Sequence, residues 1–69
     1  MSLEELETRV RKLSMRATNA KMNLHDLAEE LPVDWEKIPQ VAAETHALFQ
    51  ELSAARQELK AAKNSQAEV

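Results

Sequence analysis

Two uninterrupted seams of apolar residues, separated by a pair of prolines, constrain the fold of this chain more than any other feature. The first seam keeps spacings of three and four residues and consists of Leu3, Leu6, Val10, Leu13, Ala17, Ala20, Leu24, Leu27 and Leu31. The second keeps the same spacings and consists of Ile38, Val41, Thr45, Leu48, Leu52, Ala55, Leu59 and Ala62. Such spacings place every member on one face of an α-helix. The sequence therefore predicts an all-α fold with two long amphipathic helices.

The boundaries of the first helix follow from residues that begin and end helices. Ser2 with Glu5 three residues later has the pattern of a capping box, so the helix is expected to begin at residue 3. Pro32 disfavours helical backbone geometry at the residue before it, and so ends the helix. We therefore expect the first helix over residues 3–31.

The remaining chain divides into a turn, a second helix and a tail. A turn is expected over residues 32–38, with Asp34 capping a short helical piece. The second helix is expected over residues 39–62, because Pro39 suits the first turn of a helix, where its missing N–H costs nothing. No seam continues after this point, so residues 63–69 are expected to fray. The whole chain, residues 1–69, is then a single helical hairpin.

A connection this short makes the two helices antiparallel. When the chain is folded in this way, half of the eight layers across the seam place alanine opposite leucine: Ala20–Leu48, Ala17–Leu52, Leu13–Ala55 and Leu6–Ala62. Alternating large and small side chains allow facing layers to interdigitate. Flanking charges of opposite sign support the same register: Arg9 with Glu58, Arg16 with Glu51 and Glu7 with Lys63.

The hairpin alone is too small to cover its own seam. A chain below roughly 70–80 residues without disulfides or metal usually needs oligomerisation. The second helix carries Ala42 and Phe49 on one flank of its seam, and the first adds Ala28 beside Ala42. Further alanines lie on the other flank: Ala47, Ala54 and Ala61. We expect two hairpins to form a homodimeric four-helix bundle, and higher association stays open.

Composition excludes several classes of function. The chain has no glycine and no cysteine, so it lacks glycine-rich phosphate loops, disulfides, thiolate metal sites and thiol nucleophiles. No serine has a base and an acid at a recognisable spacing. We expect no enzymatic activity and no cofactor. No apolar run approaches 18 residues, and the acidic start lacks the features of a signal peptide. These features predict a cytoplasmic protein without membrane contact.

Charge along the chain is segregated rather than mixed. Residues 9–21 carry five bases and no acid, whereas residues 22–36 carry five acids and no Lys or Arg. Bases can bind phosphates. However, two of the five are taken up by the expected ion pairs, and Arg11, Lys12 and Lys21 are few in a chain of net charge −3. Nucleic-acid binding is therefore not favoured.

Two histidines form the only candidate metal set. In the hairpin register His25 and His46 fall at nearly the same height on the same flank, and Glu29 lies one turn after His25. A divalent cation could be held by these three residues. The alternative is that both histidines are solvated flank residues without a ligand.

Candidate partner-binding residues lie on the outward face of the first helix and in the turn. Met15 and Met22 are seven residues apart on that face, and exposed methionines suit adaptable protein contacts. They could equally be covered by the second hairpin. Trp35 could anchor a partner, or it could fold over the end of the bundle onto Leu31 and Ile38. Polar residues complete the candidate face: Asn19, Asp26 and Glu29.

One stretch of sequence is more specific than the seams. Residues 20–32 read AKMNLHDLAEELP, and Asp34-Trp35-Glu36-Lys37-Ile38-Pro39 follows after one intervening residue, Val33. This stretch resembles the small Rop-like family encoded beside nitrogen-fixation genes in diazotrophs, whose role is unassigned. The resemblance covers nearly the whole chain. It implies a self-associating helical hairpin, a setting near nitrogenase cofactor or assembly genes, and no catalytic residue.

The function expected from these observations is that of a non-enzymatic accessory protein of nitrogen fixation. Its partner would be nitrogenase, a cofactor-assembly protein or an electron donor. Two alternatives stay open: iron or other divalent metal handling through His25, Glu29 and His46, and RNA binding by analogy with the RNA-binding Rop dimer. The second alternative rests on fold alone, which is weak evidence for function.

Overall fold

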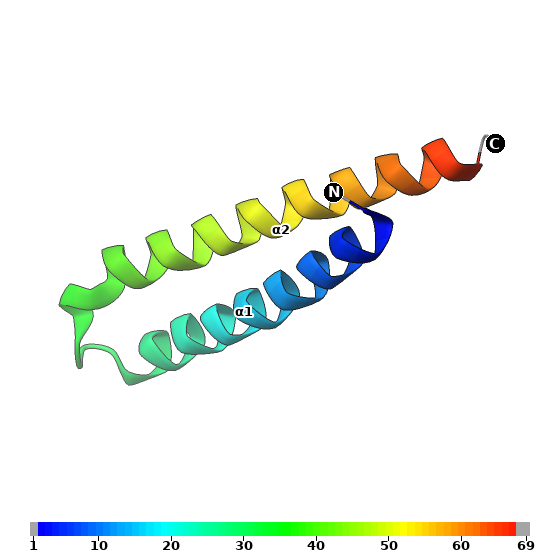
Figure 1. Cartoon of the computed structure of the whole chain (residues 1–69). Coiled ribbons are helices and arrows are strands. Elements are labelled where there is room, and N and C mark those ends of the chain that lie inside the picture. The colour runs from blue at the N-terminus through cyan, green and yellow to red at the C-terminus, as the bar shows by residue number, and fades with distance from the viewer. Residues whose placement is uncertain (1, 68–69) are drawn as a thin grey trace.

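The protein is a helical hairpin in which two long antiparallel helices lie side by side (Figure 1). The computed structural model describes the backbone of residues 2–67 and the side chains of residues 2–65. Helix α1 comprises Leu3–Glu30, the short 3-10 helix η1 comprises Trp35–Lys37, and helix α2 comprises Ile38–Ala67. The result is a rod of 56 × 15 × 15 Å with the turn at one end.

The start and end of α1 have the predicted physical causes. The Ser2 hydroxyl oxygen accepts a hydrogen bond from the backbone N–H of Glu5 at 3.2 Å, which caps the first turn. At the other end, Leu31 has φ −54° and ψ 141°, an extended geometry that the following Pro32 favours. The helix therefore ends at Glu30, one residue before the predicted limit.

The turn is held by backbone hydrogen bonds rather than by a side-chain cap. The N–H of Val33 donates to the carbonyl of Glu30 at 3.0 Å, and the N–H of Lys37 donates to the carbonyl of Asp34 at 2.9 Å. Asp34 occupies the N-cap position of η1, but its side chain makes no capping hydrogen bond, which corrects the prediction. Its φ of 57° lies in the left-handed region, which glycine adopts most easily; in this chain without glycine, aspartate adopts that geometry.

Two substitutions at Asp34 test this backbone requirement. Both Asp34→Gly and Asp34→Val remove the exposed contact with Lys37, but only valine is strongly disfavoured at positive φ. We expect Asp34→Val to lower the free energy of unfolding by about 1–2 kcal/mol relative to Asp34→Gly. Urea unfolding of the two variants measures the difference. Equal stability would show that the left-handed geometry does not constrain this position.

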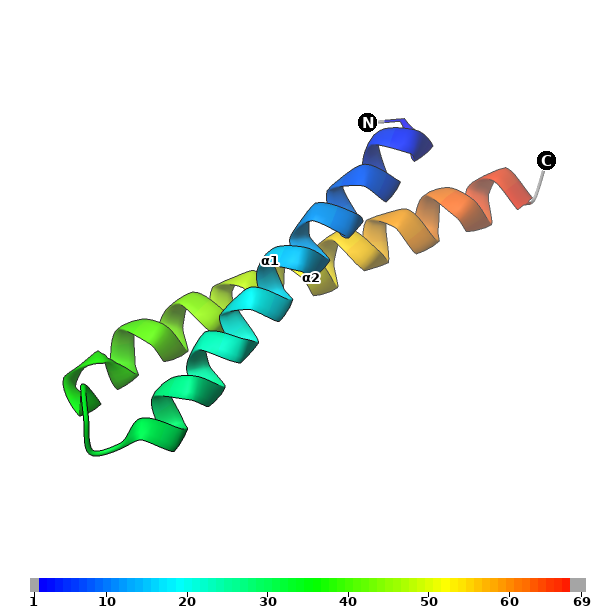
Figure 2. The same cartoon turned by 90° about the horizontal axis from the view of Figure 1, so that it is seen from below.

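The core lies where the two helices cross, near the middle of the rod (Figure 2). Four side chains form it, and these are the two central alanine–leucine layers of the predicted register: Leu13, Ala17, Leu52 and Ala55. Ala17 and Ala55 are each only 1 % exposed. Small side chains at this point let the helix backbones approach closely while the leucines fill the space beside them. The predicted seam is confirmed: among its members only the terminal Leu31 and Ile38 are exposed.

Thr45 is the one polar residue of the seam, and its hydroxyl is satisfied within the hairpin. Its Oγ1 lies 2.8 Å from the carbonyl oxygen of Val41 and 3.4 Å from that of Ala20 on α1. A half-buried hydroxyl without a partner would cost free energy, and these carbonyls remove that cost.

Two further predictions are wrong. The second helix does not end at residue 62: α2 continues to Ala67, and residues 63–67 contain no proline or glycine that would end it. The last two residues of the predicted frayed tail, 68–69, lie outside the described residues. The expected interhelical ion pairs are also absent. Among the described side chains, no Lys or Arg nitrogen of one helix lies within 4.0 Å of a carboxylate oxygen of the other. Long exposed side chains gain little from such pairs and stay solvated.

Candidate functional site

Helix α1 presents two exposed methionines on the side that faces away from α2. Met15 is 64 % and Met22 59 % exposed, and the neighbouring polar candidates Asn19, Asp26 and Glu29 are exposed as well. Met15 and Met22 stand opposite the seam because each lies two residues from a seam residue on either side. Exposed methionines adapt to irregular protein surfaces, so this face can serve as a contact surface.

The turn carries a second exposed apolar group, which we call the turn patch: Leu31, Val33, Trp35 and Ile38. Trp35 is 60 % exposed and Val33 59 %. The single hairpin thus leaves much of the indole ring uncovered, and the alternative that Trp35 folds over the end of a bundle onto Leu31 and Ile38 stays a prediction. Acidic side chains surround the patch: Glu30, Asp34 and Glu36. An exposed Trp among charged residues is typical of a protein-binding anchor.

The candidate metal residues are only partly brought together. His25 Nε2 lies 3.4 Å from Glu29 Oε1, and His25 Nδ1 lies 3.7 Å from Asp26 Oδ1. His46 instead lies beside Phe49 and Ser53 in a hollow of α2. Within the described part of the chain, no group of three His, Asp or Glu residues is arranged to hold a metal ion. The three-residue set inferred from the sequence is thus not assembled.

Helix α2 has one exposed aromatic side chain, Phe49, at 42 % exposure. It lines two shallow hollows of about 290 and 430 Å³, which share Phe49, Ser53 and Gln57 in their walls. We call this side of α2 the Phe49 face, defined by Ala42, His46, Phe49, Ser53 and Arg56. These residues are spaced by three and four, so they share one helix face beside the seam. A half-exposed aromatic ring beside hollows suits a surface that packs against another helix.

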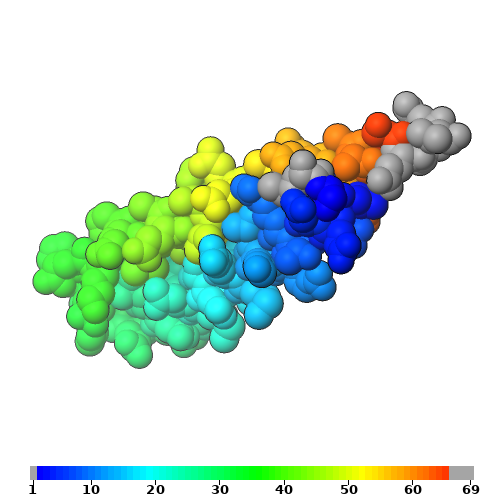
Figure 3. All heavy atoms as spheres, viewed as in Figure 1, coloured from blue at the N-terminus to red at the C-terminus, as the bar shows by residue number. Residues whose placement is uncertain are grey.

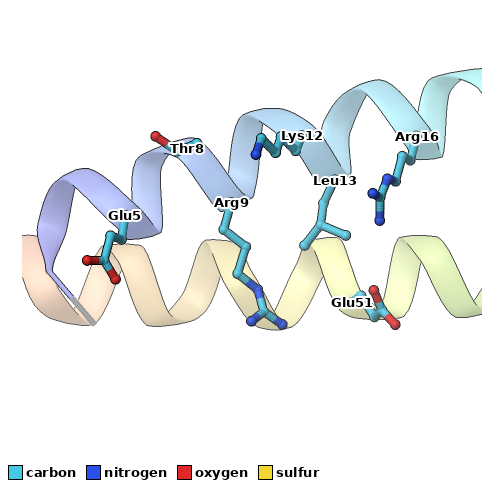
Figure 4. Close-up of a pocket in the computed structure, with 7 residues that line it drawn as sticks. All are labelled: Glu5, Thr8, Arg9, Lys12, Leu13, Arg16 and Glu51. Atoms are coloured by element: carbon cyan, nitrogen blue, oxygen red, sulfur yellow. The ribbon is translucent and has the colours of Figure 1, made fainter.

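A basic groove lies on the other flank of the seam. It has a volume of about 390 Å³ and is lined by Glu5, Thr8, Arg9, Lys12, Leu13, Arg16 and Glu51. Figure 4 shows Arg9 and Arg16 extending from α1 toward α2, with Leu13 between them and Glu51 facing Arg16. Both arginines were predicted to form ion pairs with α2, so this groove was not predicted from the sequence. The run of bases over residues 9–21 was the signal that pointed to it.

The space-filling view shows the rod with the turn at one end (Figure 3). The side chains of α1 and α2 meet along the rod, and the core holds only aliphatic residues. No helix of the described residues is long and apolar enough to cross a membrane.

Sequence comparison agrees with the hairpin geometry. The family model described as Rop-like matches residues 1–64, which is most of the chain. The chain belongs to the Rop-like family. No solved structure matches this Rop-like chain.

Several curated relatives are named as UPF0437 proteins. A UPF0437 protein of Sinorhizobium fredii is 54 % identical over 63 residues, covering 91 % of this chain and 94 % of the relative. One of Azorhizobium caulinodans is 50 % identical over 58 residues, or 84 % of each chain. A relative from Frankia alni is 45 % identical over 47 residues, covering 68 % of this chain and 57 % of its own length. That protein is named for its position in the nifX-nifW intergenic region.

Proposed function

We propose that this Rop-like protein is a non-enzymatic accessory protein of nitrogen fixation that acts by binding other proteins. The observation that carries the proposal is the relative of Frankia alni that is named for the nifX-nifW intergenic region. Genes named nif serve nitrogen fixation, so a partner among nitrogenase, its cofactor-assembly proteins or its electron donors fits this setting.

The surfaces of the hairpin support a binding role rather than catalysis. The core contains aliphatic side chains, and the seam hydroxyl of Thr45 is already hydrogen-bonded. Large apolar side chains are instead exposed, with Met15, Met22 and Trp35 each at least 59 % accessible. Aromatic and methionine side chains contribute strongly to protein interfaces. We therefore propose the methionine face of α1 and the turn patch as the contact surfaces.

The working form proposed for the protein is a homodimeric four-helix bundle. The chain exposes 5438 Å², whereas a compact monomer of 7.8 kDa would expose about 4,400 Å². The excess of about 1,000 Å² per chain is of the size that each partner buries in a stable interface, about 600–1,000 Å². The radius of gyration, 15.8 Å, likewise exceeds the value of about 11 Å for a compact chain of this length.

The Phe49 face is the surface that we propose for the dimer contact. Phe49 lies near the middle of the rod, so two hairpins related by a two-fold axis can bring both rings to the centre of the interface. The rings would then fill the hollows beside them. Ala42 permits close approach on the same face.

Charge supports an antiparallel arrangement of the two hairpins. The turn half of the rod, residues 22–47, carries six acids and one Lys. The open half, residues 2–21 and 48–65, carries eight bases and five acids. Placing the turn of one hairpin beside the open end of the other brings opposite net charges together, whereas a parallel dimer would bring like charges together.

Affinity capture from a diazotrophic host growing on dinitrogen tests the proposed function. Tagged wild-type protein is expected to recover a nitrogenase, cofactor-assembly or electron-donor protein in near-stoichiometric amount. Trp35→Ala or Met22→Glu is expected to reduce that recovery at least about tenfold, since each removes an exposed apolar contact. Ala43→Glu, an exposed change on α2 outside the hollows of the Phe49 face, serves as the control and is expected to recover the partner as well as wild type. A wild-type bait that returns alone would contradict the proposal.

A further inference from the structure

The basic groove contains three cations that the hairpin itself does not use. Arg9, Lys12 and Arg16 follow one another at spacings of three and four residues, so they lie along one side of α1. None of them has a carboxylate oxygen within 4.0 Å among the described side chains. Glu51 faces Arg16 across the groove but stays outside this distance (Figure 4).

The cations of the groove are hydrogen-bond donors, so a ligand that fits the groove must accept hydrogen bonds. Guanidinium and ammonium groups only donate, and the fork of Arg matches the two oxygens of a carboxylate. The hydroxyl of Thr8 is already committed, because its Oγ1 lies 3.0 Å from the carbonyl oxygen of Glu4. Leu13, only 5 % exposed, provides an apolar floor between the two arginines. The groove thus offers three donors along one side of α1, with the nearly buried Leu13 at its base.

We propose that this groove binds an acidic α-helical segment of a partner protein. A second helix lying along α1 has the same rise of about 1.5 Å per residue. Carboxylates at spacings of three and four residues on that helix would therefore meet Arg9, Lys12 and Arg16 in register. An apolar side chain of the segment would cover Leu13, and a basic side chain would face Glu51.

The acids in the groove favour a protein segment over a nucleic acid. Glu5 and Glu51 stand in the same walls as the bases, so an unbroken row of phosphates would meet both carboxylates. The groove also contains no aromatic ring on which a base could stack. A helix can instead place charges of either sign where the groove requires them.

The groove is separate from the surfaces assigned to the proposed function. Glu51 precedes the seam residue Leu52, and Phe49 follows the seam residue Leu48, so the two side chains leave α2 on opposite flanks of the seam. A dimer formed through the Phe49 face leaves the groove open. Each dimer would then carry two equivalent grooves, and the inference goes beyond the proposed nitrogen-fixation role.

Fluorescence anisotropy with a labelled peptide tests the groove directly. The probe is a designed helical peptide of about 20 residues with Glu at spacings of three and four on one face. A second peptide has the same composition but distributes its Glu residues around the helix. At low salt we expect the first peptide to bind at least about fivefold more tightly, since only its carboxylates match the spacing of the cations.

Matched variants locate the binding. We expect Arg9→Glu and Arg16→Glu each to weaken binding of the first peptide about tenfold, because each replaces an attraction by a repulsion. Arg11→Glu makes the same charge change on the same helix outside the groove, and should alter affinity by no more than about twofold. Circular dichroism and molecular mass check that each variant keeps its helices and its association state.

Three outcomes would overturn the proposal. If both peptides bind with equal affinity, or if Arg11→Glu weakens binding as much as Arg9→Glu and Arg16→Glu do, the binding is general electrostatic attraction rather than recognition by the groove. Tighter binding of a single-stranded RNA that displaces the peptide would favour a nucleic acid instead. Amide chemical shifts of the wild-type protein give a second readout if a variant fails to fold. They should change around residues 5–16 and at Glu51, and changes confined elsewhere would refute the site.

Discussion

Truncation of Leu52 to alanine is expected to lower the free energy of unfolding by about 2–5 kcal/mol. Leu52 is 3 % exposed and packs in the central cluster with Ala17. The truncation leaves a cavity that the small neighbour cannot fill. Because a core of this size supplies only about 3–5 kcal/mol in total, most chains of this variant should be unfolded at 25 °C. Urea unfolding followed by circular dichroism measures the change.

A compensating substitution tests whether Ala17 and Leu52 form one layer. Ala17→Leu alone should overpack the crossing and cost about 1–3 kcal/mol. Combined with Leu52→Ala, it restores the volume of the layer, so the double variant should recover at least half of the summed loss. Ala43→Leu makes the same change at an exposed position of α2 and should be nearly neutral. A double variant that shows only the sum of both losses would contradict the layer.

Replacement of Phe49 by glutamate is expected to weaken self-association roughly hundredfold or more. In the proposed dimer the two Phe49 rings meet at the centre of the interface, and a carboxylate there would be buried without a partner. In the single hairpin Phe49 is 42 % exposed and outside the buried cluster, so the fold itself does not depend on it. Sedimentation equilibrium gives the dissociation constants.

Met15→Glu is the matched control for Phe49→Glu. It introduces the same charge at a residue that is 64 % exposed on the outward face of α1. The dimer proposed here leaves that face free, so the control should associate as wild type does. Loss of association in Met15→Glu with none in Phe49→Glu would move the interface to the methionine face.

Most of the fold could be predicted because helix periodicity and capping are local properties. The spacing of the seam identified the residues that the structure buries, down to the central layers of Leu13, Ala17, Leu52 and Ala55. Ser2 and Pro32 act on the neighbouring backbone alone, so the limits of α1 could be predicted to within one residue. The hairpin register then followed from the matching of large and small side chains.

The turn and the surfaces could not be predicted in the same way. The left-handed backbone of Asp34 results from closing a short connection, which no local pattern in a chain without glycine indicates. Arg9 and Arg16 were assigned to ion pairs because each lies level with a glutamate of α2 along the rod. A matching position along the rod does not decide whether two long solvated side chains meet. The metal set of His25, Glu29 and His46 was inferred from height along the rod as well, and no such three-residue group is assembled among the described residues. Surface contacts of this kind depend on side-chain direction, which spacing alone does not determine.

The measurement that most directly tests the association of the hairpin is thermal unfolding of the wild-type protein over a roughly hundredfold range of concentration. If two hairpins form one bundle, unfolding is coupled to dissociation. The melting temperature should then rise steadily with concentration, and the native mass should be that of two chains of 7.8 kDa. A melting temperature independent of concentration, together with the mass of a single chain, would contradict the bundle and leave the Phe49 face free for another partner.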